Sequence, residues 1–425
     1  MFKTVRNAFK LPDLRRKILF TILILVLYRL GAVIPVPYVD AETLSSVMGG
    51  ATLLSYLNIM SGDALSKATL FALSIQPYIT ASIVMQLLTI AIPALEKMSK
   101  EGEEGRKKIN SITRYVTVGL ALITAYGYYA YMKTLGIITN TGVFAAFVII
   151  ACYCAGAALI MWLGEKINDD GIGNGISLIL LVNILSSGPQ VVASLWDLCQ
   201  RGAWGIVAAE AVLIVAVAII VFMVFFTNSE RRIPVQYAKK VVGRKIYGGQ
   251  SSNLPIKLNM SGVMPIIFAS SIVSIPATLQ LIFPAKAGSF GEKVYNFFSS
   301  TSWFYPIAMF VLIIAFAYFY IAISFNPVEV SNNIKKQGGF VQGIRPGRPT
   351  VEFITKILNR ITFIGALFLG IVAVFPIIVN IVSGSSLGSI AFGGSSLLIV
   401  VGVILETATE LEAQMTMRHY KGFLE

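Results

Sequence analysis

This chain of 425 residues contains ten apolar stretches that are nearly free of charged side chains. Each is about 20 residues long, the length that a helix needs to cross the hydrocarbon core of a bilayer. Hydrophobic residues make up 56% of the sequence and charged residues only 13%, which excludes a water-soluble enzyme and a disordered chain. The sequence therefore predicts an all-α polytopic membrane protein with ten transmembrane helices. The predicted spans are 18–36, 68–92, 115–131, 143–163, 172–191, 205–226, 260–283, 304–325, 361–382 and 392–410.

The positive charges are distributed unevenly among the segments that connect these spans. If the N-terminus is cytosolic, the cytosolic segments hold 28 of the 34 lysines and arginines, the outer loops hold five, and Arg29 lies inside the first span. Lysine and arginine are enriched in the cytosolic loops of membrane proteins. We therefore expect both termini to be cytosolic.

The spans divide into two halves of five, and a five-span unit repeated in tandem inserts the second time upside down. The second span of each half carries a similar segment, PYITASIV at 77–84 and PIIFASSIV at 265–273. Chance remains the alternative explanation, because membrane helices use few residue types. We predict two inverted five-helix halves. The boundaries are a cytosolic tail at 1–17, a first half at 18–203, a second half at 204–412 and a cytosolic tail at 413–425.

The loop between the first two spans contains a short apolar segment near 52–66. Its apolar core of about ten residues, roughly 15 Å of helix, is too short to cross a membrane. It could be an amphipathic helix on the outer surface. It could instead be a re-entrant helix, which is tolerated at membrane depth only against protein or a water-filled cavity. In the second interpretation, it is a mobile stopper in an aqueous funnel.

Side chains suited to catalysis, metal binding or proton transfer are scarce. His419, the only histidine, lies in the polar C-terminal tail, and the three cysteines build no disulfide framework. Solute pumps and carriers place acids or histidines at mid-membrane, whereas Glu210 and Glu406 lie toward the ends of their spans. We expect no catalytic residue, no metal and no cofactor. A secondary solute transporter with inverted repeats is the alternative function, and an intramembrane enzyme is disfavoured.

Two cytosolic loops are long and basic. Loop 227–258 has seven lysines and arginines against one acid, and loop 326–360 has six against two acids. Contacts with anionic lipid explain part of this charge. The length of the loops and the rigid GIRPGRP turn at 343–349 indicate docking of an acidic cytosolic partner or of RNA phosphate. The predicted docking residues are Arg345, Arg348, Lys239, Lys240, Arg244 and Lys245.

Several segments resemble one protein family. They are PVP at 35–37, LNIMSG at 57–62, FALSIQPYITAS at 71–82, GIGNGIS at 171–177, NMSGVMP at 259–265, NP at 326–327, GIRPG at 343–347 and FGG at 392–394. In this order, over essentially the whole chain, they resemble the bacterial SecY family (SecY/Sec61-alpha), the central subunit of the Sec protein-translocation channel.

The resemblance implies roles for individual residues around a central pore. It implies a constriction ring of aliphatic side chains at Ile75, Ile79, Ile176, Leu180, Ile267 and Ile399. It places a plug at Thr52, Leu53, Leu54, Tyr56, Leu57, Asn58 and Met60. It also places a lateral gate to lipid between the second and third spans on one side and the seventh and eighth on the other. The expected polar contacts across this gate are Thr80, Gln86 and Ser270.

The resemblance also implies partners and a location. The expected partners are the small subunits SecE and SecG, the motor ATPase SecA, the ribosome, signal-peptide-bearing preproteins, nascent membrane proteins and anionic lipids. The expected location is the bacterial plasma (inner) membrane. The chain is then a channel that passes unfolded polypeptides and releases hydrophobic segments sideways into lipid. It is not an enzyme, and its driving energy comes from a partner, because the chain has no nucleotide-binding motif.

Overall fold

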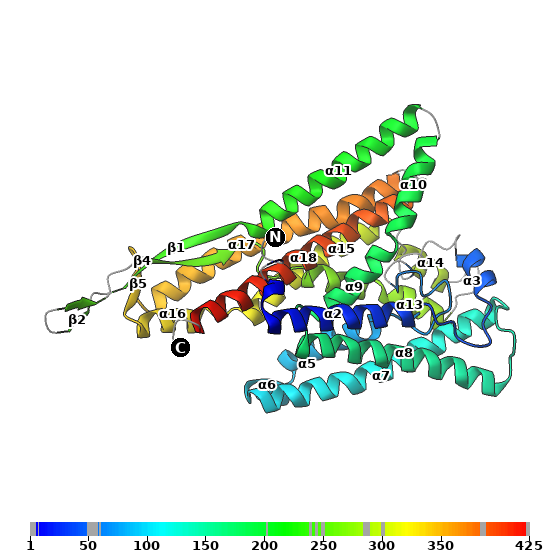
Figure 1. The fold of residues 1–425 in the computed structure, drawn as a ribbon, viewed down its shortest axis with the longest axis horizontal. Helices are drawn as coiled ribbons and strands as arrows, with labels where there is room; N and C mark the ends of the chain where they lie inside the picture. The colour runs from blue at the N-terminus through cyan, green and yellow to red at the C-terminus, as the bar shows by residue number, and fades with distance from the viewer. Residues whose placement is uncertain are drawn as a thin grey trace.

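A computed structural model of the chain describes residues 6, 8–48, 58, 61–200, 203–237, 240–242, 245–247, 251–283, 290–298, 302–382 and 388–421. Long helices lie side by side along the longest axis of the molecule (Figure 1). The helices of the first half are α2 (Pro12–Gly31), α3 (Ala41–Met48), α5 (Gln76–Ala91), α6 (Pro93–Lys100), α7 (Glu103–Thr134), α8 (Val143–Asp170), α9 (Gly175–Ser186) and α10 (Gly188–Gln200).

The second half follows the same pattern, with a small sheet added. Its helices are α11 (Ala203–Asn228), α12 (Met264–Val273), α13 (Ile275–Ile282), α14 (Phe290–Phe297), α15 (Phe304–Ser324), α16 (Pro327–Lys336), α17 (Arg348–Val382) and α18 (Gly388–Lys421). Its strands are β1 (Glu230–Tyr237), β2 (Lys240–Val242), β3 (Lys245–Tyr247), β4 (Ser251–Lys257) and β5 (Gly339–Val341). The end of α18 and the strands lie at the left of Figure 1, whereas α3 and α14 lie at the right.

Each predicted span overlaps one helix, or two helices joined by a break. Within the described residues, five stretches are long and apolar enough to cross a membrane, and α5 with α6 makes a sixth if this pair, bent by 100°, counts as one span. The five are Val143–Asp170, Gly175–Gln200, Gly205–Asn228, Phe304–Lys336 and Arg348–Val379. Helix α2 is not among them because it carries Arg15, Arg16, Lys17 and Arg29 within its 20 residues. The fold agrees with ten spans, and the count itself stays a prediction.

Two predicted spans have shorter helices than expected. Helix α2 ends at Gly31 rather than near residue 36, and α5 begins at Gln76 rather than near residue 68. The intervening chain turns back on itself, and Leu70 N donates to Ile34 O at 2.9 Å. Asp63, Ala68 and Ser74 there have φ values of 66°, 46° and 52°. This left-handed backbone is incompatible with helix, so the second helix cannot start earlier.

The glycine-rich segment before α9 makes the tight turn that its composition predicts. Gly173 has φ +86°, and Asn174 caps α9 by accepting hydrogen bonds from the backbone N–H groups of Ile176 and Ser177. A Cβ at Gly175 would collide with the carbonyl oxygen of Gly164 on α8. Helices α8 and α9 can therefore pack this closely only because position 175 lacks a side chain.

The two long basic loops form one structural unit. Strand β1 of the first loop pairs antiparallel with β4 of the same loop and with β5 of the second loop. Ile233, Val235 and Ile256 of the sheet pack on Ile354 and Leu358 of α17 in one buried cluster. The sequence predicted only helices, so this small sheet is an addition to the expected fold.

Candidate functional site

The six residues of the predicted ring lie in the largest hydrophobic cluster of the molecule. The exposed fractions are 1% for Ile75, 2% for Ile79, 1% for Leu180, 1% for Ile267 and 6% for Ile399, and the half-buried Ile176 packs against the same cluster. They come from the start and first turn of α5 and from α9, α12 and α18. Helix α5 contacts α12, and α9 contacts α18. Aliphatic side chains from four separate helices are therefore part of, or packed against, the same large buried cluster, and their role as a constriction remains a prediction.

Local sequence explains how two of these helices present the ring residues. Ile75 and Ile79 are four residues apart, as are Ile176 and Leu180, so each pair lies on one face of the backbone turn that carries it. Proline at the second position of α5 and of α12, Pro77 and Pro265, fits the first helical turn because that turn needs no N–H donor there. The similar segments noted in the two halves thus begin the two helices that contact each other.

Those two helices belong to the seam at which the family resemblance places a lateral gate. Helix α5 contacts α12, and α7 contacts α13. Gln76 Nε2 donates a hydrogen bond across this seam to Ser274 Oγ at 2.9 Å. Ser274 is 4% exposed and also donates to the carbonyl oxygen of Ser271 at 2.7 Å. The seam is therefore closed by packing and by a half-buried polar contact.

The three predicted gate residues make hydrogen bonds within their own helices. Thr80 donates to the Gln76 carbonyl at 3.1 Å, Gln86 to the Ser82 hydroxyl at 3.4 Å, and Ser270 to the Ile267 carbonyl at 2.9 Å. The sequence interpretation did not select Gln76 or Ser274. The sequence does contain a signal for Gln76, because a glutamine is unusual in the first turn of an apolar helix. Only the rotation of α5 against α12, however, shows that the Gln76 side chain reaches across the seam to Ser274.

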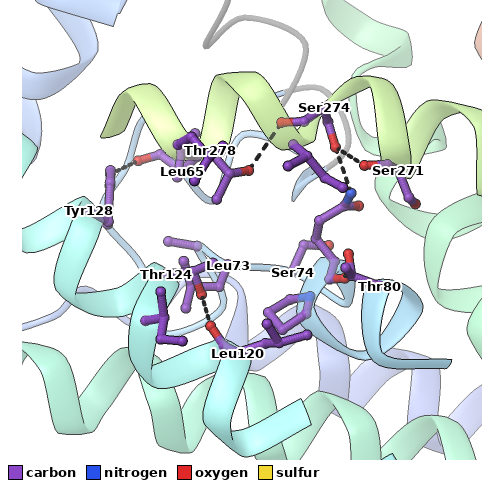
Figure 2. A pocket seen from close by; sticks show the side chains of 16 residues that line it. Leu65, Leu73, Ser74, Thr80, Leu120, Thr124, Tyr128, Ser271, Ser274 and Thr278 are labelled. Atoms are coloured by element: carbon purple, nitrogen blue, oxygen red, sulfur yellow. Dashed lines mark hydrogen bonds between the residues drawn. The ribbon is translucent and has the colours of Figure 1, made fainter. Parts of the chain in front are cut away.

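A cavity of about 270 Å³ opens beside this hydrogen bond, between the two sides of the seam. Figure 2 shows Ser271, Ser274 and Thr278 on one side and Thr80, Leu120 and Thr124 of α5 and α7 on the other. Its lining is mostly apolar, and Ser271 Oγ is buried without a hydrogen-bond partner among the described residues. The cavity shows that the seam is not tightly packed along its whole length.

The predicted plug lies largely outside the described residues. Thr52, Leu53, Leu54, Tyr56, Leu57 and Met60 are outside them, and Asn58 is described. Asn58 Nδ2 donates to Asp63 Oδ1 at 2.9 Å, and Gln190 Nε2 on α10 donates to Asp63 Oδ2 at 2.7 Å. Tyr128 on α7 donates to the Leu65 carbonyl at 2.6 Å. The chain that follows the predicted plug is therefore fastened to α7 and α10.

The predicted docking turn is rigid and exposed. Gly343 and Gly347 have φ values of +81° and +108°, and Thr350 Oγ1 donates to the Arg345 carbonyl at 2.9 Å. Arg345 is exposed beside Pro346. Arg348 Nε lies 3.1 Å from Glu352 Oε1, with the two side chains 91% and 67% exposed. The backbone of the turn is thus fixed while both guanidinium groups reach solvent.

The other predicted docking residues lie in the first basic loop. Lys240 begins β2 and Lys245 begins β3, and these strands pair antiparallel, with Lys240 opposite Tyr247. Lys239 and Arg244 fall outside the described residues. Strands β2 and β3 lie at the far left end of Figure 1, beyond β1 and β4. Basic residues of this loop therefore lie at the same end of the molecule as the docking turn.

Comparison with known proteins decides the family. The SecY family model matches residues 69–408. This chain belongs to the SecY family. The protein translocase subunit SecY of Streptomyces galbus is 42% identical over 440 residues, and that of Mycobacterium tuberculosis is 41% identical over 446 residues. Both alignments cover 100% of this chain and 100% of the relative. Like its relatives, this SecY-family chain is a translocation-channel subunit and not an enzyme.

Solved structures share the fold at lower sequence identity. A structure described as that of a protein conducting channel has a TM-score of 0.67 at 18% identity and covers 94% of this chain and 92% of its own. Sec61 in the canine ribosome-channel complex has a TM-score of 0.64 at 17% identity, with 94% and 92% covered. The predicted helical membrane-channel fold is thus confirmed, with the small sheet of the basic loops as an addition.

Proposed function

We propose that this SecY-family chain forms a bacterial plasma-membrane channel that passes unfolded secretory polypeptides through the six-residue aliphatic ring. The observation that supports the proposal is that one buried hydrophobic cluster includes, or is packed against by, residues of α5, α9, α12 and α18, namely Ile75, Ile79, Ile176, Leu180, Ile267 and Ile399. In this proposal the resting ring is closed, the segment near 52–66 covers it from outside, and both termini are cytosolic.

Aliphatic side chains suit a seal that must open for peptides. They offer water no hydrogen bonds, so a narrow gap between them dewets and ions are excluded. An extended peptide can replace these contacts with its own apolar contacts, so that opening the ring for a client costs less than wetting it. The ring therefore excludes ions because it stays dry, and it admits a polypeptide without any charged filter.

The seam between α5–α7 and α12–α15 is proposed as the lateral exit. Its Gln76–Ser274 hydrogen bond and the cavity beside it support this role, because a seam that opens toward lipid needs few and weak fastenings. A hydrophobic client segment lowers its free energy by leaving the aqueous pore for lipid through such an opening. Thr80, Gln86 and Ser270 would lose no bond in this motion, since each is bonded within its own helix.

The driving force is proposed to come from a partner on the cytosolic side. The two basic loops share one sheet, so a partner that binds the Arg345 turn also contacts the unit that carries Lys240 and Lys245. The motor ATPase SecA and the ribosome are the proposed partners, and two structural relatives are described in ribosome complexes, canine Sec61 and yeast Ssh1. SecE, SecG and anionic lipids are proposed as further partners, with signal-peptide-bearing preproteins and nascent membrane proteins as clients.

Ion conductance of the purified channel in a planar bilayer tests the ring. Replacing Ile79 and Ile267 by serine and deleting 52–60 should produce a larger chloride-permeable leak than either change alone, because hydroxyl groups let water wet the gap. Ile149→Ser is the matched control, since Ile149 is 0% exposed in a separate cluster. It should destabilise the protein without opening a conductance. A folded combined variant that stays as tight as the parent would exclude the ring.

A further inference from the structure

Three buried polar side chains form a chain of hydrogen bonds through the core. The Tyr28 hydroxyl on α2 donates to Asn183 Oδ1 on α9 at 2.6 Å, and Asn183 Nδ2 donates to Ser74 Oγ at 3.1 Å. Tyr28 and Asn183 are 0% exposed, and Ser74 is 4% exposed. Buried polar groups cost free energy unless they are hydrogen-bonded, and apolar side chains would fill the same space without that requirement. We call this chain of bonds the Tyr28–Asn183–Ser74 brace.

The brace lies next to the proposed ring on two of its helices. Ser74 directly precedes Ile75 at the start of α5. Asn183 lies three residues after Leu180 and seven after Ile176, so these residues share one face of α9. The Asn183–Ser74 bond therefore joins the part of α9 that carries two ring residues to the turn that carries two others.

The backbone conformation of Ser74, the residue that makes this hydrogen bond, is unfavourable in free energy. Ser74 has φ +52°, a left-handed conformation that glycine adopts freely and that an L-residue with a side chain adopts at a cost in free energy. Such strain persists only where the surroundings impose it. A hydrogen bond to Asn183 offsets part of the cost, and only a residue with a side chain can make it. The strained serine is thus explained by its hydroxyl.

We propose that Asn183 is a positioning residue for the channel constriction. Its two hydrogen bonds fix Ile75 and Leu180 relative to each other and so set how tightly the resting ring excludes water. This inference rests on the ring of the proposed function. A residue that only stabilises the fold would change the unfolding temperature without loosening the ring, so the test must measure the ring itself.

The test uses a thiol at the ring. In a channel whose Cys152, Cys154 and Cys199 are replaced by alanine, Leu180→Cys reports access by the rate at which a water-soluble maleimide modifies it. Tyr28→Phe removes one hydrogen bond of the brace. The loss of one buried hydrogen bond, about 1 kcal/mol, shifts an equilibrium by about fivefold, so the modification rate should rise by about fivefold. Tyr153→Phe is the matched control, because the Tyr153 hydroxyl on α8 has only a 4.0 Å contact to Met132 Sδ, away from the ring. It should leave the rate at the parent value.

Ser74→Gly separates positioning from stability. This variant relieves the left-handed strain and removes the hydroxyl, so it should keep or raise the unfolding temperature while it speeds modification of Leu180→Cys. Unchanged modification in both Ser74→Gly and Tyr28→Phe would overturn the brace. The Ile79→Ser, Ile267→Ser channel with 52–60 deleted distinguishes the two failures. If that channel leaks while the brace variants stay tight, only the brace is wrong, and if it does not leak, the ring itself is wrong.

Discussion

The hydrogen bond between Gln76 and Ser274 predicts that the lateral gate opens more readily when this bond is removed. Gln76→Leu keeps the size of the side chain and removes the donor that crosses the seam at 2.9 Å. Ser274 then still donates to the Ser271 carbonyl, so its proton is not left buried without an acceptor. The variant therefore loses the net value of one hydrogen bond and little more.

That value sets the size of the expected effect. A buried hydrogen bond contributes about 1 kcal/mol net, and interhelical hydrogen bonds in membranes are at or somewhat below this figure. A loss of about 1 kcal/mol from the closed state raises the open-to-closed ratio of the seam by about fivefold. A gate that opens more readily should admit clients whose signal peptides bind weakly.

The assay is translocation into proteoliposomes of a preprotein with a shortened signal-peptide core. Gln76→Leu should raise the translocated fraction by about fivefold at low yield, with little change for the intact signal peptide. Gln86→Leu is the matched control, because Gln86 bonds Ser82 within the same helix α5. Equal gains in both variants, or no gain in Gln76→Leu, would show that the bond across the seam does not hold the gate.

Two further substitutions test the docking turn and the packing at α9. Arg345→Glu should fold normally because Arg345 is exposed, and motor-driven translocation should fall by at least about tenfold, because charge reversal at a docking contact places like charges together. Lys356→Glu, exposed on α17, should lower the initial rate less, and a parental rate in Arg345→Glu would remove that residue from the docking site. Gly175→Ala should destabilise the protein by about 1–3 kcal/mol because its methyl group meets the Gly164 carbonyl. Gly119→Ala, with open space around it, should leave the melting temperature in detergent unchanged or higher, and equal melting of the two variants would contradict the close approach of α8 and α9.

The sequence predicts the helices well because the bilayer leaves the chain few alternatives. A long apolar stretch that crosses lipid must satisfy its backbone internally, so spans such as Val143–Asp170 are helices for a local reason. The start of α5 is different. The backbone of 62–75 is held in turns by contacts with α7, α9 and α10, and Ser74 occupies a left-handed conformation that its residue type disfavours.

The sheet formed by the two basic loops could not be predicted because its pairing is not local. Strand β1 contains Pro234 and β4 contains Pro255, and proline argues against a strand inside a sheet. The register tolerates Pro234 because β5 pairs only with Val235, Gln236 and Tyr237 of β1. That partner lies in the other basic loop, about a hundred residues further along the chain. The local pattern of apolar and polar residues does not reveal a pairing with so distant a segment.

The candidate site divides in the same way. Family resemblance selects the six ring residues, and the structure shows five of them inside one large buried cluster and Ile176 packed against it. The hydrogen bond across the seam depends on how α5 is rotated against α12, so Gln76 and Ser274 emerge only from the packed helices. The brace at Asn183 likewise depends on three segments that are far apart in sequence.

Crosslinking of a stalled secretory chain tests most directly whether a polypeptide passes through the aliphatic ring. Cys152, Cys154 and Cys199 are first replaced by alanine. Single-cysteine variants of Ile79, Leu180 and Ile267 would then each face a stalled chain that carries one cysteine at mid-membrane depth, and a mild oxidant would join the two thiols as a disulfide. Val217→Cys on α11 is the control, because Val217 is 57% exposed on the outer surface of the described helices. The account predicts crosslinks to all three ring positions and none to Val217→Cys. Crosslinks to Val217→Cys without crosslinks to the ring would contradict a path through the centre of the molecule.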